Sequence, residues 1–180
     1  MLSGVKPPPP PAPPPAPPAP PPAPAPPAPP PAQPGDARPL WLVCEDGLEY
    51  CDRLQRFLGG EFRFERVTHA AALLAAAAAA PAAGVIMDLD FRRTSDELLV
   101  DEHGAGDRPL APEERGRLTE SQGIFVLRAL RRGGHRLPAI LCADLEDPEQ
   151  IAFLERTLAP LAVVPSSESI TALARRLRGA

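Results

Sequence analysis

Lysine is almost absent from this sequence. The chain has 180 residues and 19 lysines and arginines together, but Lys6 is its one lysine and the other 18 basic residues are arginine. This absence excludes a lysine side chain from any site in residues 7–180. A site there that needs a positive charge has to use arginine instead.

Cysteine is also scarce. Cys44, Cys51 and Cys142 are odd in number and contain no Cys-x-x-Cys pair, which argues against disulfides and zinc. Cys44 lies in an apolar run and Cys51 at a helix-face position, a pattern that favours buried free thiols in a reducing compartment. No charged-then-apolar signal-peptide pattern is present, because proline begins at position 7. We therefore expect a cytoplasmic protein.

Long apolar runs and clustered basic faces are absent. The longest weakly polar stretch, residues 70–85, is mostly alanine and is interrupted by Pro81 and Gly84, which excludes a membrane span. A net charge of −4 without a basic cluster argues against nucleic-acid binding. The sequence has no Ser–His–Asp or Cys–His arrangement and no phosphate-cradling glycine loop, so an enzyme is not expected.

Proline, in contrast, is abundant and unevenly placed. Of the 28 prolines, 20 lie in residues 1–34 and 8 in residues 35–180. Proline removes backbone donors and fixes φ, so residues 1–38 are predicted to be a disordered arm rich in polyproline II structure. The arm is interpreted as a spacer or tether, with a ligand for an aromatic-lined groove as the alternative. Residues 39–180 have the size of one folded domain.

Short apolar runs alternate with amphipathic segments through that domain. The pattern predicts strands at residues 40–44, 62–67, 84–88, 137–143 and 161–164, and helices at 48–58, 69–80, 124–132, 148–158 and 167–177. Asp147 and Ser167 are the predicted N-caps of the last two helices. Residues 91–122 break the rhythm and are interpreted as an extended, charged surface insertion, with a hairpin or a short helix from Pro112 onward. The alternation indicates an α/β fold with a parallel sheet covered on both faces.

The carboxyl ends of parallel strands meet at one edge of the sheet, where ligands bind. Glu45 and Asp46 follow the first strand and Asp88 ends the third, so we expect these three carboxylates to converge. Like charges so close raise one another's pKa unless a divalent cation neutralises them. Oxygen ligands suit Mg²⁺ or Mn²⁺, and a carboxylate beside such an ion can accept a phosphoryl group.

Five segments in this order resemble the receiver domain of bacterial two-component response regulators. They are Leu42–Asp46 (LVCED), Val85–Leu89 (VIMDL), Gly123–Arg131 (GIFVLRALR), Leu137–Ala143 (LPAILCA) and Val163–Pro165 (VVP). The resemblance covers residues 39–180 apart from the insertion. It implies a flavodoxin-like, doubly wound, five-stranded parallel sheet of order 2-1-3-4-5.

The resemblance also implies roles for the three carboxylates. Asp88 becomes the phosphoacceptor candidate, Glu45 and Asp46 form the acidic pocket, and all three become candidate ligands of Mg²⁺. The implied partners are signalling proteins, either a histidine kinase or a downstream effector or scaffold, and a homodimer is a further option.

Three positions depart from the family pattern. Cys142 stands where the family has threonine or serine, Leu161 where it has an aromatic switch residue, and Val164 where it has lysine before proline. Losing the hydroxyl and the ammonium removes two contacts to a phosphoryl group of about 1–3 kcal/mol each. Arg92 and Arg93, just past Asp88, are the nearest arginines that could replace the lysine.

These departures favour a degenerate receiver, or pseudo-receiver, that acts as a protein-interaction module. Its docking surface would be the last helix–strand–helix face or the insertion. One alternative is a working phosphorelay receiver that is phosphorylated on Asp88 with atypical switch residues. Another is a localisation or scaffold adaptor tethered by the proline-rich arm.

Overall fold

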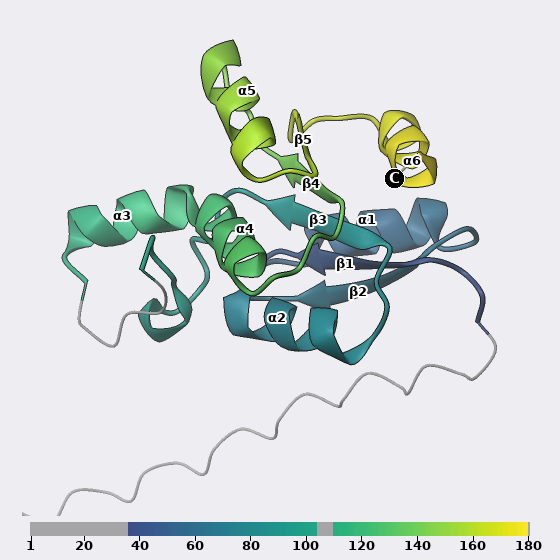
Figure 1. The fold of residues 1–180 in the computed structure, drawn as a ribbon, viewed down its shortest axis with the longest axis horizontal. Helices are drawn as coiled ribbons and strands as arrows, with labels where there is room; N and C mark the ends of the chain where they lie inside the picture. The colour runs from purple at the N-terminus through teal and green to yellow at the C-terminus, as the bar shows by residue number, and fades with distance from the viewer. Residues whose placement is uncertain (1–35, 104–109, 180) are drawn as a thin grey trace, which may run out of the picture. The chain divides into compact units, whose positions relative to one another are not determined.

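Five strands form one parallel sheet in the order β2-β1-β3-β4-β5 (Figure 1). The computed structural model describes residues 36–103 and 110–179, and the expected arm therefore lies outside it except for residues 36–38. The strands are β1 (Leu40–Cys44), β2 (Arg63–Val67), β3 (Gly84–Asp88), β4 (Ala139–Cys142) and β5 (Leu161–Val164). The predicted flavodoxin-like sheet and its strand order are confirmed.

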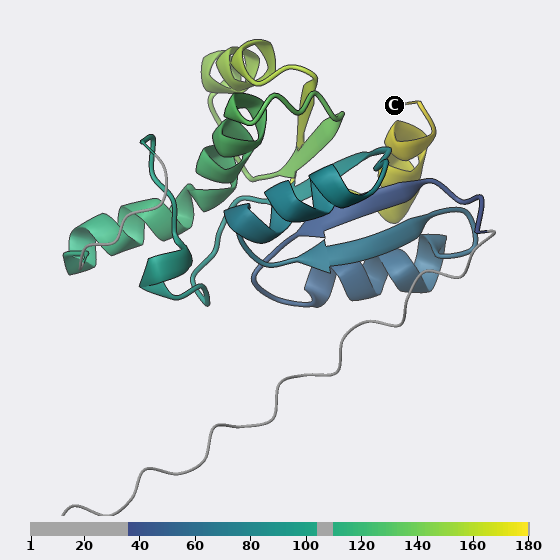
Figure 2. The same ribbon diagram turned by 60° about the horizontal axis from the view of Figure 1, so that its bottom comes forward.

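Helices cover both faces of this sheet. They are α1 (Glu49–Leu58), α2 (Ala70–Ala79), α3 (Pro112–Glu120), α4 (Gln122–Arg132), α5 (Pro148–Thr157) and α6 (Ile170–Arg178). One core cluster contains side chains of α2, α4 and α5, and the other contains side chains of α1 and α6. Figure 2 shows α1 and α2 on opposite sides of β1 and β2. The chain thus has three layers.

Burial explains which apolar runs became central strands. All five residues of β1 are buried, because β1 lies between β2 and β3 and under helices on both faces. At the edges, β2 contains three charged residues among its five, and three of the four residues of β5 are only partly buried. Continuous apolar runs are typical of strands in the middle of a parallel sheet.

Side-chain caps fix the starts of three helices. The Nδ1 atom of His69 accepts from the amide of Ala72 at α2, and the carboxylate of Asp147 accepts from the amide of Glu149 at α5. The predicted cap of the last helix was wrong by two residues. Ser169, not Ser167, accepts from the amide of an α6 residue and has the extended backbone of an N-cap.

The segment between β3 and α4 is more than a surface insertion. It contains the predicted helix at Pro112, here α3, and a 3₁₀ turn, η1 (Asp96–Leu98). The prediction of a surface insertion was wrong for Phe91, Leu99 and Val100, because these three side chains are buried. The side-chain amide of Gln122, oriented to suit both contacts, donates to the carbonyl of Val100 at 3.1 Å and accepts from its amide at 2.9 Å. These contacts tie the described part of the insertion to α4.

Within the described residues, no helix has both the length and the apolar composition that a membrane span requires.

Candidate functional site

Asp88 is the last residue of β3 and lies at the carboxyl edge of the sheet. Its register partner on β4 is Cys142. On the other side β3 pairs with β1, which ends at Cys44 just before Glu45 and Asp46. A cavity of about 280 Å³ opens here, and it is lined by Asp46, Glu49, Tyr50, Asp88, Asp90, Arg92 and Arg93. The strands therefore bring Asp46 and Asp88 into one pocket.

Gly123 holds the start of α4 against the end of β3. The Gly123 amide donates to the carbonyl of Leu89 at 3.0 Å. A Cβ atom at this position would overlap the carbonyl oxygen of Asp88, so only glycine allows so close an approach. The chain thus leaves β3 and returns to the same point after the insertion.

Two carboxylates in the cavity carry raised pKa values. Burial raises the pKa of Asp88 to about 6, and the charges of Asp46 and Asp90 add to the effect, against hydrogen bonds from the amides of Leu89 and Asp90. Burial also raises the pKa of Asp90. The Oδ1 atom of Asp90 is buried and has no hydrogen-bond partner in the described structure. One carboxylate oxygen at the cavity is therefore buried without a donor.

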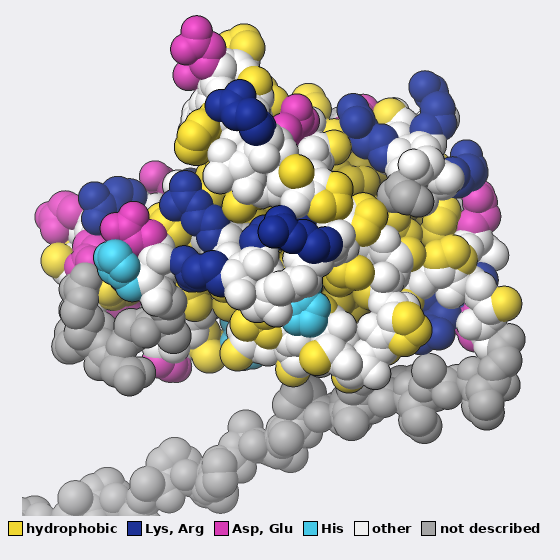
Figure 3. All heavy atoms as spheres, in the orientation of Figure 1, with side chains coloured by type: hydrophobic (Ala, Val, Ile, Leu, Met, Phe, Trp, Pro, Cys, Tyr) yellow, Lys and Arg dark blue, Asp and Glu magenta, His cyan; other side chains and the backbone are white. Residues whose placement is uncertain are grey.

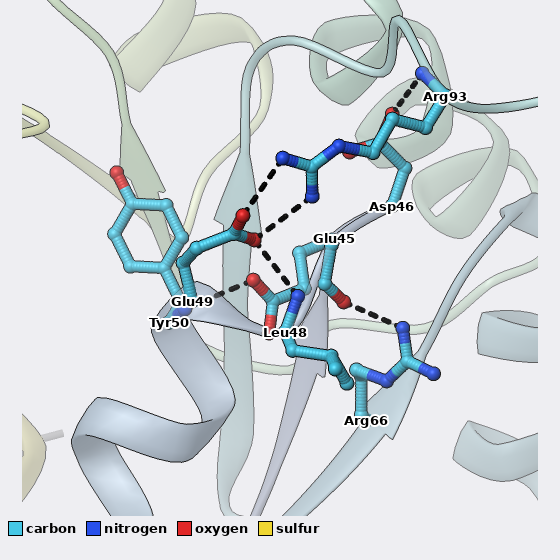
Figure 4. A network of polar contacts seen from close by, with 8 residues as sticks. Glu45, Asp46, Leu48, Glu49, Tyr50, Arg66 and Arg93 are labelled. Carbon is cyan, nitrogen blue, oxygen red and sulfur yellow. Dashed lines mark hydrogen bonds and ion pairs between the residues drawn. The ribbon is translucent and has the colours of Figure 1, made fainter.

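Arginines from the start of the insertion supply the positive charge, and Figure 4 shows the contacts of one of them, Arg93. The backbone amide of Arg93 donates to a carboxylate oxygen of Asp46, and its guanidinium binds both oxygens of Glu49 at 2.8 and 3.1 Å. This contact lowers the pKa of Glu49 to about 2. Arg92 pairs with Asp90, with its Nε atom 2.7 Å from Oδ2. Both arginines are thus held by carboxylates other than Asp88.

Glu45 lies apart from this pocket. Its side chain is 1% exposed and accepts from the amides of Tyr50 at 2.9 Å and Cys51 at 2.8 Å, at the start of α1. The carboxylate therefore caps the helix and offsets the partial positive charge of its N-terminus. The expected convergence of three carboxylates was wrong for Glu45, because the amides of α1 hold its carboxylate and it does not line the pocket.

The remaining residues suit Mg²⁺ by type but not by arrangement. Asp46, Asp88 and Asp90 offer the oxygen ligands that Mg²⁺ takes. Within residues 36–103 and 110–179, however, no three histidine, cysteine, aspartate or glutamate side chains group closely enough to hold a metal ion. Asp46 also already accepts from Arg93. The geometry does not fit the predicted ion without rearrangement.

Known proteins resemble this chain in structure rather than in sequence. No protein-family model and no curated protein matches the sequence. Solved structures match at TM-scores near 0.55. The receiver domain of the Francisella response regulator 1452 is 15% identical and matches at 0.55, covering 78% of this chain and 94% of that one. A sensor protein from Polaromonas sp. JS666 is 22% identical and matches with a TM-score of 0.55, covering 79% of this chain and 95% of that one. The Vibrio cholerae chemotaxis protein CheY4 is 13% identical and matches at 0.54, covering 79% and 98%.

The fold is that of a receiver domain. The predicted resemblance is confirmed at the level of the fold. In this receiver fold Asp88 ends the third strand, and Val164, 1% exposed, ends the fifth strand just before Pro165. No lysine occurs among the described residues, so no ammonium group reaches the pocket from them.

The other two positions that were predicted to depart from the receiver pattern, Cys142 and Leu161, lie at the end of β4 and the start of β5. Burial raises the pKa of Cys142 to about 12, and the next residue, Ala143, is buried as well. Neither side chain at this strand end carries a hydroxyl group. Leu161 is the first residue of β5, at the end of the strands opposite Asp88, and is half-buried. What these positions do in the protein stays a prediction.

Three lining residues were missed by the sequence reasoning. Glu49, Tyr50 and Asp90 were given no role, although they line the cavity. Burial raises the pKa of the Tyr50 hydroxyl to about 12, and this hydroxyl lies 3.4 Å from the carbonyl oxygen of Ser166. The first turn of the helix after Asp46 lies at the same edge as the strand ends. This nearness in sequence to Asp46 and Asp88 could have predicted that the three residues line the cavity.

Proposed function

We propose that this protein is a degenerate receiver, a protein-interaction module of bacterial signal transduction that works without phosphorylation of Asp88. The observation that carries the proposal is the charge balance of the cavity. Its cations are Arg92 and Arg93, and each is already paired with a carboxylate of the protein. A phosphoryl group on Asp88 would have to break these pairs to gain a counter-charge.

The switch positions support the same proposal. A phosphorylated receiver needs contacts that are stronger in one conformation than in the other, because a group with equal contacts in both shifts nothing. Val164 and Cys142 offer no charged donor, and the hydroxyl of Tyr50 has the carbonyl of Ser166 as a neighbour. A conformational change driven from Asp88 therefore lacks its usual source of energy.

The proposed docking surface is the face formed by α5, β5 and α6. Phe153 on α5 is 48% exposed, with the guanidinium of Arg156 5.9 Å from its ring centroid. The half-buried residues of β5 continue this apolar surface at the edge of the sheet. Charges of both signs are spread over the face seen in Figure 3, as expected of a surface that binds proteins rather than nucleic acid. The partners would be a histidine kinase, an effector or a scaffold in the cytoplasm, or a second copy of the chain.

The test is phosphorylation by a small donor. The full chain is incubated with acetyl phosphate and Mg²⁺, and its intact mass is measured over time beside the Asp88→Asn variant. We expect no phosphoryl adduct on either protein. An adduct that appears on the wild type and disappears in Asp88→Asn would overturn the proposal.

That second outcome would support a phosphorelay receiver with atypical chemistry. The observation in its favour is that Asp88 lines an open cavity together with Arg92 and Arg93. Release of Arg93 from Glu49 would supply the missing cation. Arg93→Gln should then abolish the adduct while Arg178→Gln, a matched exposed arginine paired with Glu61, leaves it unchanged.

The proline-rich arm suggests a third role, as a localisation or scaffold adaptor. The domain division at residues 1–38 and 39–180 is part of this proposal. Deleting residues 1–38 should change the cellular location of the protein and leave its thermal unfolding unchanged. An unchanged location would contradict the adaptor role.

A further inference from the structure

A second cavity lies at the opposite end of the sheet from Asp88. It measures about 350 Å³ and is lined by residues from the starts of β1, β4 and β5 and from the end of α6. Its walls are largely apolar, with Trp41, Ile140 and Leu161 among them. The strands are parallel and Asp88 ends β3, so this cavity is separate from the candidate site. Its volume falls within the range of small-molecule sites.

Small residues in the sheet explain why space remains here. Trp41 pairs in register with Gly84 on β3, and a Cβ on Gly84 would overlap the indole ring. The ring therefore occupies the place of the missing side chain and reaches toward Pro138, which precedes β4. On β5, Ala162 is the register partner of Ile140 and leaves room where a larger side chain would fill the cavity.

One cation at the cavity has no partner within the described part of the chain. Arg176 is the one charged residue among those that line the cavity, and its guanidinium forms no ion pair within the described part of the chain. The neighbouring Arg178, in contrast, binds both carboxylate oxygens of Glu61 at 2.8 and 2.9 Å.

We propose that this cavity binds a small organic anion with an apolar body, of the class of medium-chain carboxylates. The hydrocarbon part packs against Pro138, Leu161 and Ala162, and the carboxylate pairs with Arg176. An apolar wall with one unpaired cation selects for an anion over a neutral molecule of the same length.

The chain provides its own reporter, because Trp41 is its one tryptophan. Octanoate and 1-octanol are titrated into the full chain, and tryptophan fluorescence is recorded. We expect a saturable change with octanoate, and weaker binding of 1-octanol by a factor of up to about five, because an exposed ion pair contributes at most about that factor.

Variants assign this effect to the cavity. Arg176→Gln should weaken octanoate binding by the same factor of up to about five, to the level of 1-octanol. Arg175→Gln, an exposed arginine of α6 that does not line the cavity, should leave it unchanged. Ala162→Leu should weaken both ligands by filling the space. The absence of a saturable change, equal binding of both ligands, or equal losses in the two arginine variants would each overturn the proposal.

Discussion

Two helical glycines should respond in opposite directions to the same substitution. In Gly123→Ala the new methyl group meets the backbone of β3, because its Cβ would overlap the Asp88 carbonyl oxygen and lie 3.0 Å from Asp88 C and Leu89 Cα. In Gly116→Ala, in the middle of α3, the methyl group meets nothing within 4 Å. Comparing the two variants therefore separates the effect of packing at the end of β3 on stability from the effect of helix propensity.

The magnitudes follow from these surroundings. Extra volume in a packed region costs about 1–3 kcal/mol, and backbone atoms cannot rotate away as a side chain does. Because alanine has a higher helix propensity than glycine, the substitution adds up to about 1 kcal/mol to the free energy of unfolding in either helix. We expect Gly123→Ala to destabilise the protein by about 2 kcal/mol and Gly116→Ala to stabilise it by about 1 kcal/mol. For a domain of this size the two melting temperatures should differ by about 10 °C.

The assay is thermal and urea denaturation of the full chain, followed by far-ultraviolet circular dichroism at one pH. The wild type should melt between the two variants. If Gly123→Ala proves as stable as the wild type, the close contact between α4 and β3 is absent in solution. If Gly116→Ala proves the less stable of the two, the reasoning about α3 is wrong.

Three further predictions concern the carboxylates. Glu45→Gln should lower the free energy of unfolding by about 1 kcal/mol in urea denaturation, because one neutral oxygen replaces a carboxylate that caps α1 through two amides. Arg93→Gln should raise the pKa of Glu49 from about 2 toward 4.5, as measured by an NMR titration. The pKa of Asp88 lies at about 6 in the folded protein and near 3.8 otherwise, so the folded state binds this proton more tightly. Without divalent ions, stability should fall as the pH rises from about 4 to 6, and Asp88→Asn should remove this loss.

Each of these predictions has a control. Glu65→Gln, on the exposed side of β2, should leave the free energy of unfolding unchanged. If it lowers this free energy as much as Glu45→Gln does, the loss in Glu45→Gln does not come from capping of α1. Arg178→Gln should raise the pKa of Glu61, which its partner arginine lowers, and leave Glu49 at about 2. A constant stability difference between the wild type and Asp88→Asn from pH 4 to pH 7 would contradict the raised pKa of Asp88.

Most of the fold could be predicted because its signals are local. Continuous apolar runs indicated β1 and β3, and Asp147 followed by Pro148 indicated the start of α5. The insertion was harder to interpret, because Phe91 and Leu99 follow neither a helical nor a strand spacing. Their burial depends on contacts with distant elements, which no local pattern encodes.

The candidate site was predicted in part for a similar reason. Asp46 and Asp88 follow or end neighbouring parallel strands, and the topology alone is enough to predict that they lie at one edge of the sheet. The direction of the Glu45 side chain depends on its hydrogen-bond donors, and these are amides of α1, whose position the residues of the strand end do not encode. Arg93 was a candidate by its nearness in sequence, but its pairing with Glu49 required the folded path of the insertion.

The close approach of Gly123 to the end of β3 also affects how this chain can vary in length. The free energy needed to close a loop depends on how far apart its ends are held and grows only with the logarithm of its length. Here the two ends already meet at Asp88 and Leu89, whatever lies between them. Segments of very different size can therefore be exchanged at this junction while the sheet keeps its geometry, provided that the new segment covers the apolar surface now buried by Phe91 and Val100. Such an exchange would replace Asp90, Arg92 and Arg93, and with them part of the lining of the cavity.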